Sequence, residues 1–392
     1  MTKITDIPAI RFKGFSDTWE QRKLGDVVDV RSGKDYKHLS EGNIPVYGTG
    51  GFMLSVNQAL SYDEDAIGIG RKGTIDKPYI LKAPFWTVDT LFYAIPREKV
   101  DLNFAFDVFQ NIDWKKKDES TGVPSLSKTA INEIDVLVPQ YDEQQPLGQF
   151  FNRIDNLITL HQRKYDKLTN VKKSMLEKMF PQNGSNAPEI RFKGFTEAWE
   201  QRKLSEIATM HARIGWQNLR TSEFLDSGDY MLITGTDFID GAVNFDTCHY
   251  VERERYEQDK HIQIRNGSIL ITKDGTLGKV AYIQGLTMPA TLNAGVFNVE
   301  IKDENEVDNR YLFQYLKAPF LMDYVDKKAT GGTIKHLNQN ILVDFPVVLP
   351  HKAEQEKIGE YFLAIDHLIT LHQRELEKLK NLKKACLEKM FV

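Results

Sequence analysis

Hydrophobic side chains recur at every third or fourth position over two long stretches of the chain. In the first stretch the apolar positions, with one histidine among them, are Leu147, Phe150, Ile154, Leu157, Ile158, His161, Tyr165, Leu168, Val171, Met175 and Met179. The same spacing returns from Ile358 to Met390. This period predicts two long amphipathic helices. Pro146 suits the first turn of the first helix, and Pro181 ends it.

Each predicted helix is too long to bury its apolar stripe on a small domain. The 31 residues 150–180 would measure about 45 Å at the usual rise per residue. We therefore expect the two helices to pack on each other as an antiparallel coiled coil. Packing of each helix on its own neighbouring block is the alternative. The residues predicted to form the interhelix or partner interface are Ile154, Leu157, His161, Leu168, Met175, Ile365, Leu368, His372, Leu379 and Leu382.

His161 and His372 occupy equivalent places on the two stripes. A single polar position in an apolar seam commonly fixes the register of a coiled coil. We expect this role for the two histidines, and neither metal binding nor catalysis.

The segments around the helices have a different pattern. They are rich in β-branched and aromatic residues interrupted by Gly and Pro, as in DAIGIGRKGTIDKPYI and GSILITKDGTLGKVAYI. This pattern predicts short strands and tight turns, with helices around Asn103–Asp113 and Asn309–Val325. Each block is thus predicted to be a globular α+β domain of about 125–150 residues.

Two phrases occur twice in the chain. Residues 8–24 and 188–204 are identical at 13 of 17 positions, at an offset of 188 − 8 = 180. Residues 150–180 and 361–391 are identical at 20 of 31 positions, at an offset of 361 − 150 = 211. The variable blocks between them align only weakly, with RKGT at 71–74 beside KDGT at 273–276. The chain is therefore predicted to be a duplicated unit, one scaffold carrying two different surfaces.

The first repeated phrase is predicted to be the joint between a block and the helices. Its aromatic residues should be buried against the end of a helix: Phe12, Phe15 and Trp19, and again Phe192, Phe195 and Trp199. The predicted domains are a joint (1–20), a first block (21–145), a central helix (146–182), a second joint (183–200), a second block (201–355) and a C-terminal helix (356–392).

Composition narrows the class of protein. The chain has 392 residues, 41% hydrophobic and 27% charged, which indicates a soluble protein of at least two domains. Its net charge of −4 disfavours a strongly basic nucleic-acid binder, although the local distribution of charge matters more. No apolar run approaches the roughly 20 residues of a membrane span. With two cysteines and no secretion signal, we expect a cytoplasmic location without membrane contact.

The chain has few signs of catalysis. Residues 68–73 (GIGRKG) match the glycine pattern of dinucleotide-binding loops, but the chain continues with TIDKPYILKAP, where a helix should begin. This motif is interpreted as a turn. No phosphate-binding Walker loop, serine nucleophile motif or His/Cys metal spacing occurs. We expect no catalytic residues, no cofactor-binding residues and no metal site.

Basic, aromatic and amide side chains on the predicted loops are candidates for contact with DNA bases and phosphates. For any one of them, an ordinary solvated side chain is the alternative. The candidates are Arg31, Lys34, Lys37, Tyr47, Arg71, Lys72, Lys115, Lys116, Lys117, Lys128, His211, Arg213, Trp216, Gln217, Arg220, Lys273, Lys335 and His336.

This order of elements resembles the specificity (S) subunit of type I restriction–modification systems. The resemblance covers nearly the whole chain. It rests on WEQRKLGDV and WEQRKLSEI, on the Thr-Gly … Glu-Gln … Phe-Phe or Tyr-Phe close of each block, and on the duplicated IDxLITLHQR … KxxxLEKMF helices. In that family each variable block is a target-recognition domain for half of a bipartite, asymmetric DNA site, and the helices are conserved spacers.

The resemblance implies partners for this chain. They are double-stranded DNA, two modification (methyltransferase) subunits docked along the helices, and restriction (motor–nuclease) subunits. S-adenosylmethionine, ATP and Mg²⁺ are expected on those subunits, and no cofactor on this chain. The function implied is a non-enzymatic reader and scaffold whose helices set the spacing between the half-sites. A coiled-coil adaptor without sequence-specific DNA binding is the alternative.

Overall fold

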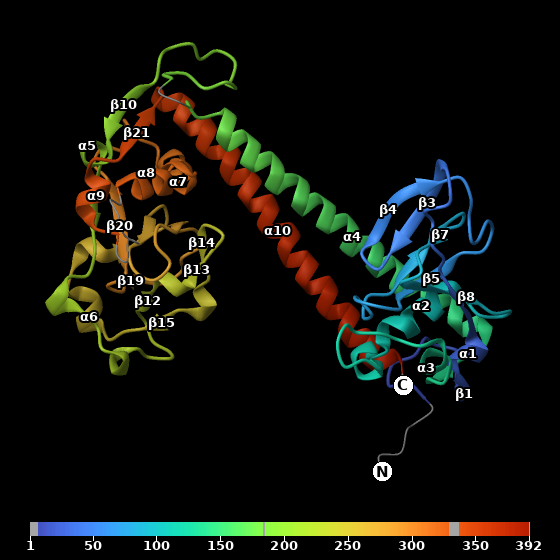
Figure 1. The fold of residues 1–392 in the computed structure, drawn as a ribbon. Helices are drawn as coiled ribbons and strands as arrows, with labels where there is room; N and C mark the ends of the chain where they lie inside the picture. Colours follow the sequence, from blue (N-terminus) through green and yellow to red (C-terminus); the bar gives the residue numbers. More distant parts are fainter. Residues whose placement is uncertain (1–6, 183–184, 329–336, 392) are drawn as a thin grey trace. The chain divides into compact units, whose positions relative to one another are not determined.

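The computed structural model describes residues 7–182, 185–328 and 337–391 (Figure 1). It divides into two compact units, Met1–Lys164 with His372–Val392, and Tyr165–Leu371. Each unit contains one variable block and parts of both long helices. Within the described ranges, no helix is long and apolar enough to cross a membrane.

The first unit is built on antiparallel strands. A two-stranded sheet joins β1 (Glu20–Lys23) to β9 (Asp135–Val138). The main sheet has the order β2 (Val28–Ser32), β8 (Leu91–Pro96), β5 (Ala66–Gly70) and β6 (Tyr79–Leu81). A second sheet has the order β4 (Gly51–Val56), β3 (Glu41–Gly48) and β7 (Trp86–Thr87), with β3 and β7 parallel.

Short helices close the core of this unit. They are α1 (Leu24–Val27), α2 (Leu102–Asn111), the 3₁₀ helix η1 (Trp114–Lys117) and α3 (Lys128–Asn132). Helix α2 begins at its Asp101 cap, whose carboxylate accepts a hydrogen bond from the Phe104 amide at 3.0 Å. The apolar face of α2, including Phe104 and Phe109, is buried against the main sheet.

The second unit repeats this plan. β10 (Glu200–Lys203) pairs with β21 (Pro346–Leu349), and the main sheet has the order β11 (Ala208–His211), β20 (Val296–Ile301), β17 (Ile269–Thr272) and β18 (Val280–Tyr282). A second sheet has the order β15 (His249–Tyr250), β12 (Met231–Ile233), β19 (Ala290–Leu292) and β16 (Gln263–Ile264). Strands β13 (Phe238–Ile239) and β14 (Ala242–Val243) form a hairpin.

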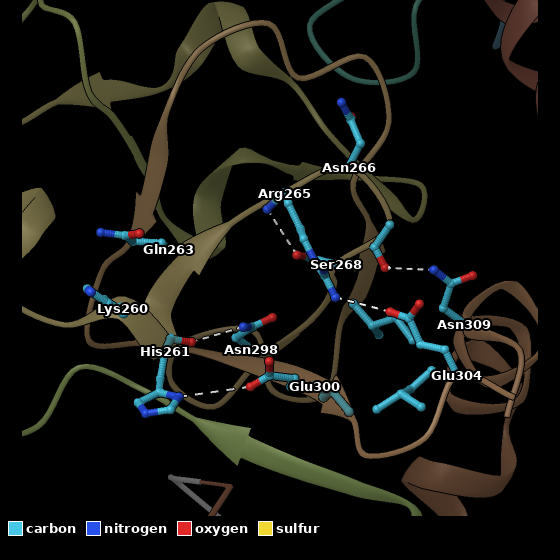
Figure 2. Close-up of a pocket in the computed structure, with 14 residues that line it drawn as sticks. Lys260, His261, Gln263, Arg265, Asn266, Ser268, Asn298, Glu300, Glu304 and Asn309 are labelled. Atoms are coloured by element: carbon cyan, nitrogen blue, oxygen red, sulfur yellow. Dashed lines mark hydrogen bonds and ion pairs between the residues drawn. The ribbon is translucent and has the colours of Figure 1, made fainter. Parts of the chain in front are cut away.

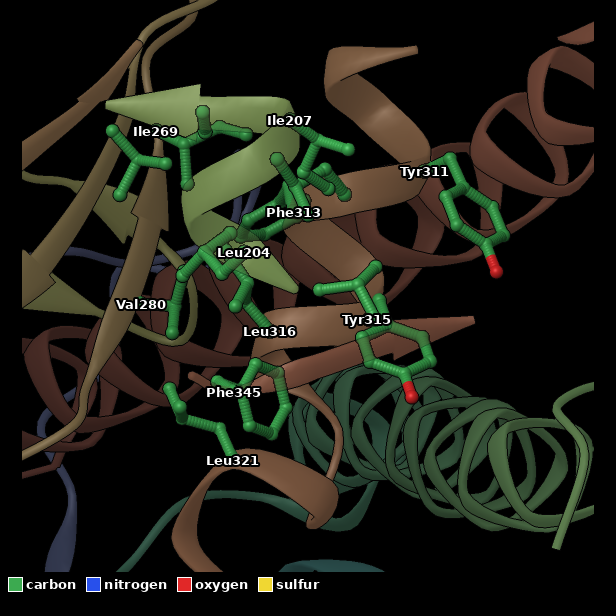
Figure 3. Close-up of a cluster of buried hydrophobic side chains, with 14 of the residues drawn as sticks. Leu204, Ile207, Ile269, Val280, Tyr311, Phe313, Tyr315, Leu316, Leu321 and Phe345 are labelled. Atoms are coloured by element: carbon green, nitrogen blue, oxygen red, sulfur yellow. The ribbon is translucent and has the colours of Figure 1, made fainter. Parts of the chain in front are cut away.

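Three helices of the second unit hold the places of α1, α2 and α3: α5 (Leu204–Ile207), α7 (Asn309–Lys317) and α9 (Gln339–Val343). Helices α6 (Arg253–Glu257) and α8 (Phe320–Lys328) have no α-helical counterpart in the described part of the first unit. The described loops of this unit also contain the 3₁₀ helices η2 (Gly215–Gln217), η3 (Thr221–Glu223), η4 (Gly235–Asp237), η5 (Phe245–Thr247) and η6 (Lys260–Ile262). Figure 3 shows α5, α7 and the main sheet contributing side chains to one core.

The two main sheets match strand by strand. The order β2-β8-β5-β6 corresponds to β11-β20-β17-β18, and both sheets are antiparallel throughout. The second sheets differ, with three strands in one unit and four in the other. The predicted α+β fold with an internal repeat is confirmed, and the shared part is the frame rather than the loops.

The structure refines two details of the predicted helices. The first long helix, α4, spans Tyr141–Lys178, so Pro146 lies in its second turn and not in its first. The helix predicted at 309–325 is two helices, because Pro319 separates α7 from α8. Proline lacks an amide hydrogen and disfavours a helical conformation in the residue before it, which explains the break.

Helix α4 and the second long helix, α10 (Lys352–Met390), pack together in both units. In the second unit the Lys172 ammonium lies 2.5 Å from the Asp366 carboxylate. In the first, Lys383 lies 2.5 Å from Asp155. The two pairs have the same sum of residue numbers, since 172 + 366 = 383 + 155 = 538, as antiparallel helices require. The predicted antiparallel packing is confirmed.

The residues predicted at the interhelix or partner interface differ in their burial. Ile154 and Ile365 are buried, and His161, Leu168, Met175, His372 and Leu379 are half-buried. Leu157, Leu368 and Leu382 are exposed, so they are not buried between the helices and remain candidates for the partner interface. The apolar stripe of a 3.6-residue period is wider than the seam that one facing helix can cover. Leucines at the edge of the stripe therefore stay in solvent.

The two joints have the same contacts. The Trp19 ring lies edge-on to Phe391 at the end of α10, and Trp199 lies edge-on to Phe180 just after α4. Both tryptophans are buried, which confirms the prediction for them. The joint phenylalanines are only half-buried: Phe12, Phe15, Phe192 and Phe195.

Candidate nucleic-acid interface

Three loops of the first unit meet at the end of strand β5. The Arg71 amide donates a hydrogen bond to the Thr90 carbonyl at 2.8 Å, and the Leu126 amide donates to the Arg71 carbonyl at 3.0 Å. The Gly73 amide reaches the Pro124 carbonyl at 2.9 Å. These bonds hold the turn after β5, the turn before β8 and the segment before α3 side by side.

The second unit has the same arrangement at Lys273. Its amide donates to the Gly295 carbonyl at 2.9 Å, and its carbonyl accepts from the Leu337 amide at 2.8 Å. Arg71 and Lys273 therefore occupy equivalent positions, as the alignment of RKGT with KDGT predicted. We call these two places the β5 loop cluster and the β17 loop cluster.

Both cations lie beside an aromatic ring of the neighbouring strand. The Arg71 guanidinium carbon is 5.8 Å from the centre of the Phe92 ring, and the Lys273 ammonium is 5.3 Å from that of Phe297. Such contacts restrict a long side chain without neutralising it. Arg71 is exposed and Lys273 is half-buried. Each loop cluster thus presents one oriented positive charge.

The glycine motif at 68–73 forms a turn, as predicted. Gly68 and Gly70 lie in β5, and Gly73 follows in the turn with a positive φ of 90°. Gly275 has the equivalent place in the second unit, with a φ of 73°. Left-handed backbone of this kind favours glycine.

Other candidates of the first unit are scattered. Lys34, Lys37, Lys72 and Lys128 are exposed. The 3₁₀ helix η1 carries Lys115, Lys116 and Lys117, of which the first pairs with Asp76 at 3.0 Å and the second with Asp113 at 2.9 Å. Arg31 pairs with Asp29 at 2.7 Å. Tyr47 is half-buried and packs against Phe52 and Tyr79.

Two candidates of the second unit are interior residues, contrary to the prediction of exposed loop positions. The Arg213 guanidinium is buried and donates to the Leu292 carbonyl at 3.0 Å and to Gln258 Oε1 at 2.9 Å. Burial, and then the charge of Arg255, lower the pKa of Arg213. Gln217 is also buried, and its side chain accepts from the Ile214 amide at 3.2 Å. Both side chains hold their loop in place and are buried, so neither is available to contact DNA.

The remaining candidates of the second unit are placed as follows. Arg220 is exposed and His211 is half-buried at the end of β11. Trp216 lies in η2, and its side chain is outside the described part of the structure. Lys335 and His336 also lie outside the described residues.

The structure adds an exposed apolar tip that sequence reasoning missed. Phe52 and Met53 lie on β4, directly after the turn that joins it to β3, and the Phe52 side chain is 63% exposed. The signal in the sequence is the run GTGGFM, a glycine turn followed by two large apolar residues.

Both halves of the chain match a known protein family. The sequence model of the type I restriction modification DNA specificity domain matches residues 16–170 and again residues 196–381. The chain belongs to this family. The two matches cover both variable blocks and most of each long helix, so the family's domain occurs twice in tandem.

Relatives in this DNA specificity family are similar along most of their length. The chain is 23% identical to the type I restriction enzyme MjaVIII specificity subunit of Methanocaldococcus jannaschii, covering 94% of this chain and 91% of that protein. It is 19% identical to the MjaIX specificity subunit of the same organism, covering 95% and 92%. The crystal structure of the type I S subunit from M. genitalium has a similar fold, with a TM-score of 0.74 at 14% identity over 98% and 99% of the chains.

The family confirms the function predicted from the sequence. The chain is a specificity subunit of the type I restriction–modification class, with two target-recognition domains. The alternative, an adaptor without DNA recognition, receives no support from these similarities.

Proposed function

We propose that this chain reads a bipartite DNA target without catalysing any reaction, each unit recognising one half-site. The observation that carries the proposal is the equivalence of the β5 and β17 loop clusters. The frame beneath them is the same, whereas the side chains they present differ. A duplicated frame with different loops is what two independent readers require.

The chemistry of each loop cluster suits DNA. Arginine can bond guanine bidentately, and lysine can bond a base edge or a phosphate. Arg71 and Lys273 lie against Phe92 and Phe297, so little side-chain freedom remains to be lost on binding. We propose that these two residues are contacts of the first and second half-sites respectively.

We propose that the helix pair fixes the number of unread base pairs between the half-sites. A flexible connection would allow many spacings, whereas paired helices allow one. The ion pairs Lys172–Asp366 and Lys383–Asp155 lie in the seam between α4 and α10. A sliding of one helix along the other would break both pairs and leave poorly solvated charges. This supports a fixed register and therefore a fixed spacing.

We also propose that two modification subunits dock on the helices. Leu157 and Leu160 on α4 are 44% and 46% exposed, and Leu368 and Leu371 on α10 are 42% and 45% exposed. The two pairs are equivalent in the repeat, because 157 + 211 = 368 and 160 + 211 = 371. Two equal apolar patches suit two copies of one partner. S-adenosylmethionine would be bound by those subunits, and ATP and Mg²⁺ by restriction subunits, in the cytoplasm.

An exchange of one block tests the proposal. Residues 21–145 are replaced by the same block of another family member, and the methylated sites are determined by methylome sequencing of a host that carries the complete system. One half-site should change, while the other half-site and the spacing stay the same. A matched exchange of residues 201–355 should change only the other half. A change in both half-sites from one exchange would contradict the proposal.

A further inference from the structure

Two histidines and a glutamate from separate segments of the second unit converge on one point. His211 ends strand β11, Glu300 lies on β20, and His261 lies in the 3₁₀ helix η6. Their ligand atoms, one from each side chain, all lie within 4.8 Å of one another. The intervals of 50 and 39 residues between them (261 − 211 and 300 − 261) match no sequence motif. For this reason the sequence predicted no metal site.

The strand pairing places two of these side chains. β11 and β20 are antiparallel, with Thr209 opposite Glu300 and His211 opposite Asn298. Residues that face each other across antiparallel strands, and residues two apart on one strand, lie on the same face of the sheet. His211 and Glu300 therefore share a face. The opposite face carries Met210 and Val299, which are buried in the core.

The third side chain is positioned through its backbone. The His261 carbonyl accepts a hydrogen bond from Asn298 Nδ2 at 3.0 Å, and the His261 amide donates to Asp259 Oδ1 at 2.9 Å. Ile262, the next residue, is fully buried. The backbone of His261 is thus tied to β20, while its imidazole faces Glu300 at the edge of a cavity of about 260 Å³ (Figure 2).

The donor atoms are close to the geometry of a metal site. Glu300 Oε2 lies 3.5 Å from His211 Nε2 and 4.0 Å from His261 Nδ1. Ligands of a tetrahedral zinc ion, at bond lengths of about 2.1 Å, are about 3.4 Å apart. The two imidazole rings are stacked, with centroids 4.5 Å apart and planes 18° apart. Half-buried His211 and exposed His261 and Glu300 must rotate about their side-chain torsions, which unstacks the two rings, to bring all three donors to one ion.

We propose that His211, His261 and Glu300 bind one divalent transition-metal ion, such as Zn²⁺. Two imidazoles and a carboxylate are a donor set that suits zinc, nickel and cobalt, whereas Mg²⁺ prefers oxygen ligands. Three protein ligands leave a coordination position for water. The ion would link β11, β20 and the η6 segment, and so stiffen the second unit.

Neighbouring groups limit the affinity. Lys260 and Arg265 line the same cavity, and Arg265 pairs with Glu304 at 3.1 Å. His211 Nε2 also contacts Thr209 Oγ1 at 3.0 Å, and this contact must be released when the nitrogen binds a metal. Binding should therefore be weaker than in a closed structural zinc site.

Titration of the full-length chain with metal tests the proposal. After treatment with a chelator, the protein is titrated with Co²⁺ and its visible absorption is recorded, then with Zn²⁺ in competition. One equivalent of Co²⁺ should give the visible absorption of a four-coordinate site, and Zn²⁺ should displace the Co²⁺. The variants His211→Gln, His261→Gln and Glu300→Gln should each lower the affinity at least tenfold.

A control variant and an unfolding measurement show whether metal binding depends on these three side chains. The variant His161→Gln changes a histidine of the helix seam and should bind Co²⁺ like the wild type. Thermal unfolding of each variant in chelator shows whether it is folded, and Zn²⁺ should raise the melting temperature of the wild type but not of Glu300→Gln. Absence of a stoichiometric site, or an affinity unchanged in all three ligand variants, would overturn the proposal. The half-site exchange tests DNA recognition separately, so failure of metal binding would leave that proposal standing.

Discussion

The Trp19 ring packs edge-on against Phe391, with ring centroids 5.9 Å apart, although the two residues lie near opposite ends of the chain. The Ile10 amide also donates to the Lys389 carbonyl at 2.9 Å. The same two contacts recur in the second unit, where Trp199 packs against Phe180 and the Ile190 amide donates to the Lys178 carbonyl. The start of the chain therefore joins the end of α10 in the way that the second joint joins the end of α4.

Truncation of the aromatic residue at the end of a helix should destabilise the unit that it closes. Phe391→Ala removes a buried ring that contacts Trp19, Phe104 and Phe151. Loss of such a ring costs about 3–5 kcal/mol. Urea unfolding should show this decrease. Phe52→Ala, which changes an exposed ring, should leave the free energy of unfolding nearly unchanged. An equal effect of both variants would contradict the conclusion that the Phe391 ring stabilises the first unit.

The buried carboxylate at the start of each long helix should depend on its arginine. Arg191 donates two hydrogen bonds to Glu354 at 2.7 and 2.8 Å, and Glu354 is fully buried. Arg191→Met leaves a buried charge unpaired and should lower the free energy of unfolding by about 3–5 kcal/mol. The double variant Arg191→Met/Glu354→Leu should recover part of the loss.

An exposed ion pair provides the control for this cycle. Lys203 and Asp344 lie 2.7 Å apart, with both side chains more than half exposed. Lys203→Met should leave the free energy of unfolding nearly unchanged, because solvent screens such pairs. If the double variant at Arg191 and Glu354 were as unstable as the single one, the unpaired carboxylate would not be the cause.

The histidines between the helices should make the protein sensitive to mild acid. Their Nδ1 atoms lie 3.1 Å apart. Burial, followed by the charges of His161 and Lys164, lowers the pKa of His372 from its usual 6.5. The unfolded chain therefore binds a proton at His372 more readily than the folded chain does. The stability that neutral His372 contributes is complete above pH 6.5 and is lost as the pH falls through the lowered pKa of the folded chain.

Denaturation at pH 7.5 and pH 5.0 measures this effect. His372→Gln should show a smaller loss of stability on acidification than the wild type. His367→Gln, which changes an exposed histidine of α10, should behave like the wild type. A His372→Gln variant with the full wild-type loss would assign the acid sensitivity to other groups.

The exposed leucines should control the number of modification subunits. Leu160→Asp and Leu371→Asp each place a charge in one of the two equivalent patches. Each variant should retain one modification subunit, and the double variant none, as measured by native mass spectrometry. Ile239→Asp, at an exposed apolar residue away from the helices, should retain both. Retention of two subunits by the double variant would show that they bind elsewhere.

Arg71 and Lys273 should affect different half-sites. Arg71→Ala should weaken binding of the assembled complex to its target by about 1–3 kcal/mol, and so should Lys273→Ala. When one half-site of the duplex is scrambled, only the substitution in the unit that reads the intact half-site should still weaken binding. Lys193→Ala, an exposed lysine of the second joint, should have little effect. Equal effects of both substitutions on both scrambled duplexes would contradict the proposal that each unit reads one half-site.

Much of the architecture could be predicted from the sequence. The 3.6-residue period predicted both long helices, and the repeats predicted a common frame, because a duplicated phrase folds into the same local structure twice. The alignment of RKGT with KDGT located the β5 and β17 loop clusters, since a turn that requires a left-handed glycine keeps that glycine. The buried tryptophans of the joints followed from their place in the repeated phrase.

Other features were decided only by tertiary structure. Arg213 has the sequence character of a surface residue, yet carbonyl groups brought from distant segments enclose its guanidinium. Leu157 and Leu368 belong to the apolar stripe, but one facing helix is too narrow to cover them. His211, His261 and Glu300 meet because strand pairing and one backbone hydrogen bond bring three segments together. Sequence periodicity describes one element at a time, whereas burial and the meeting of side chains depend on which elements become neighbours.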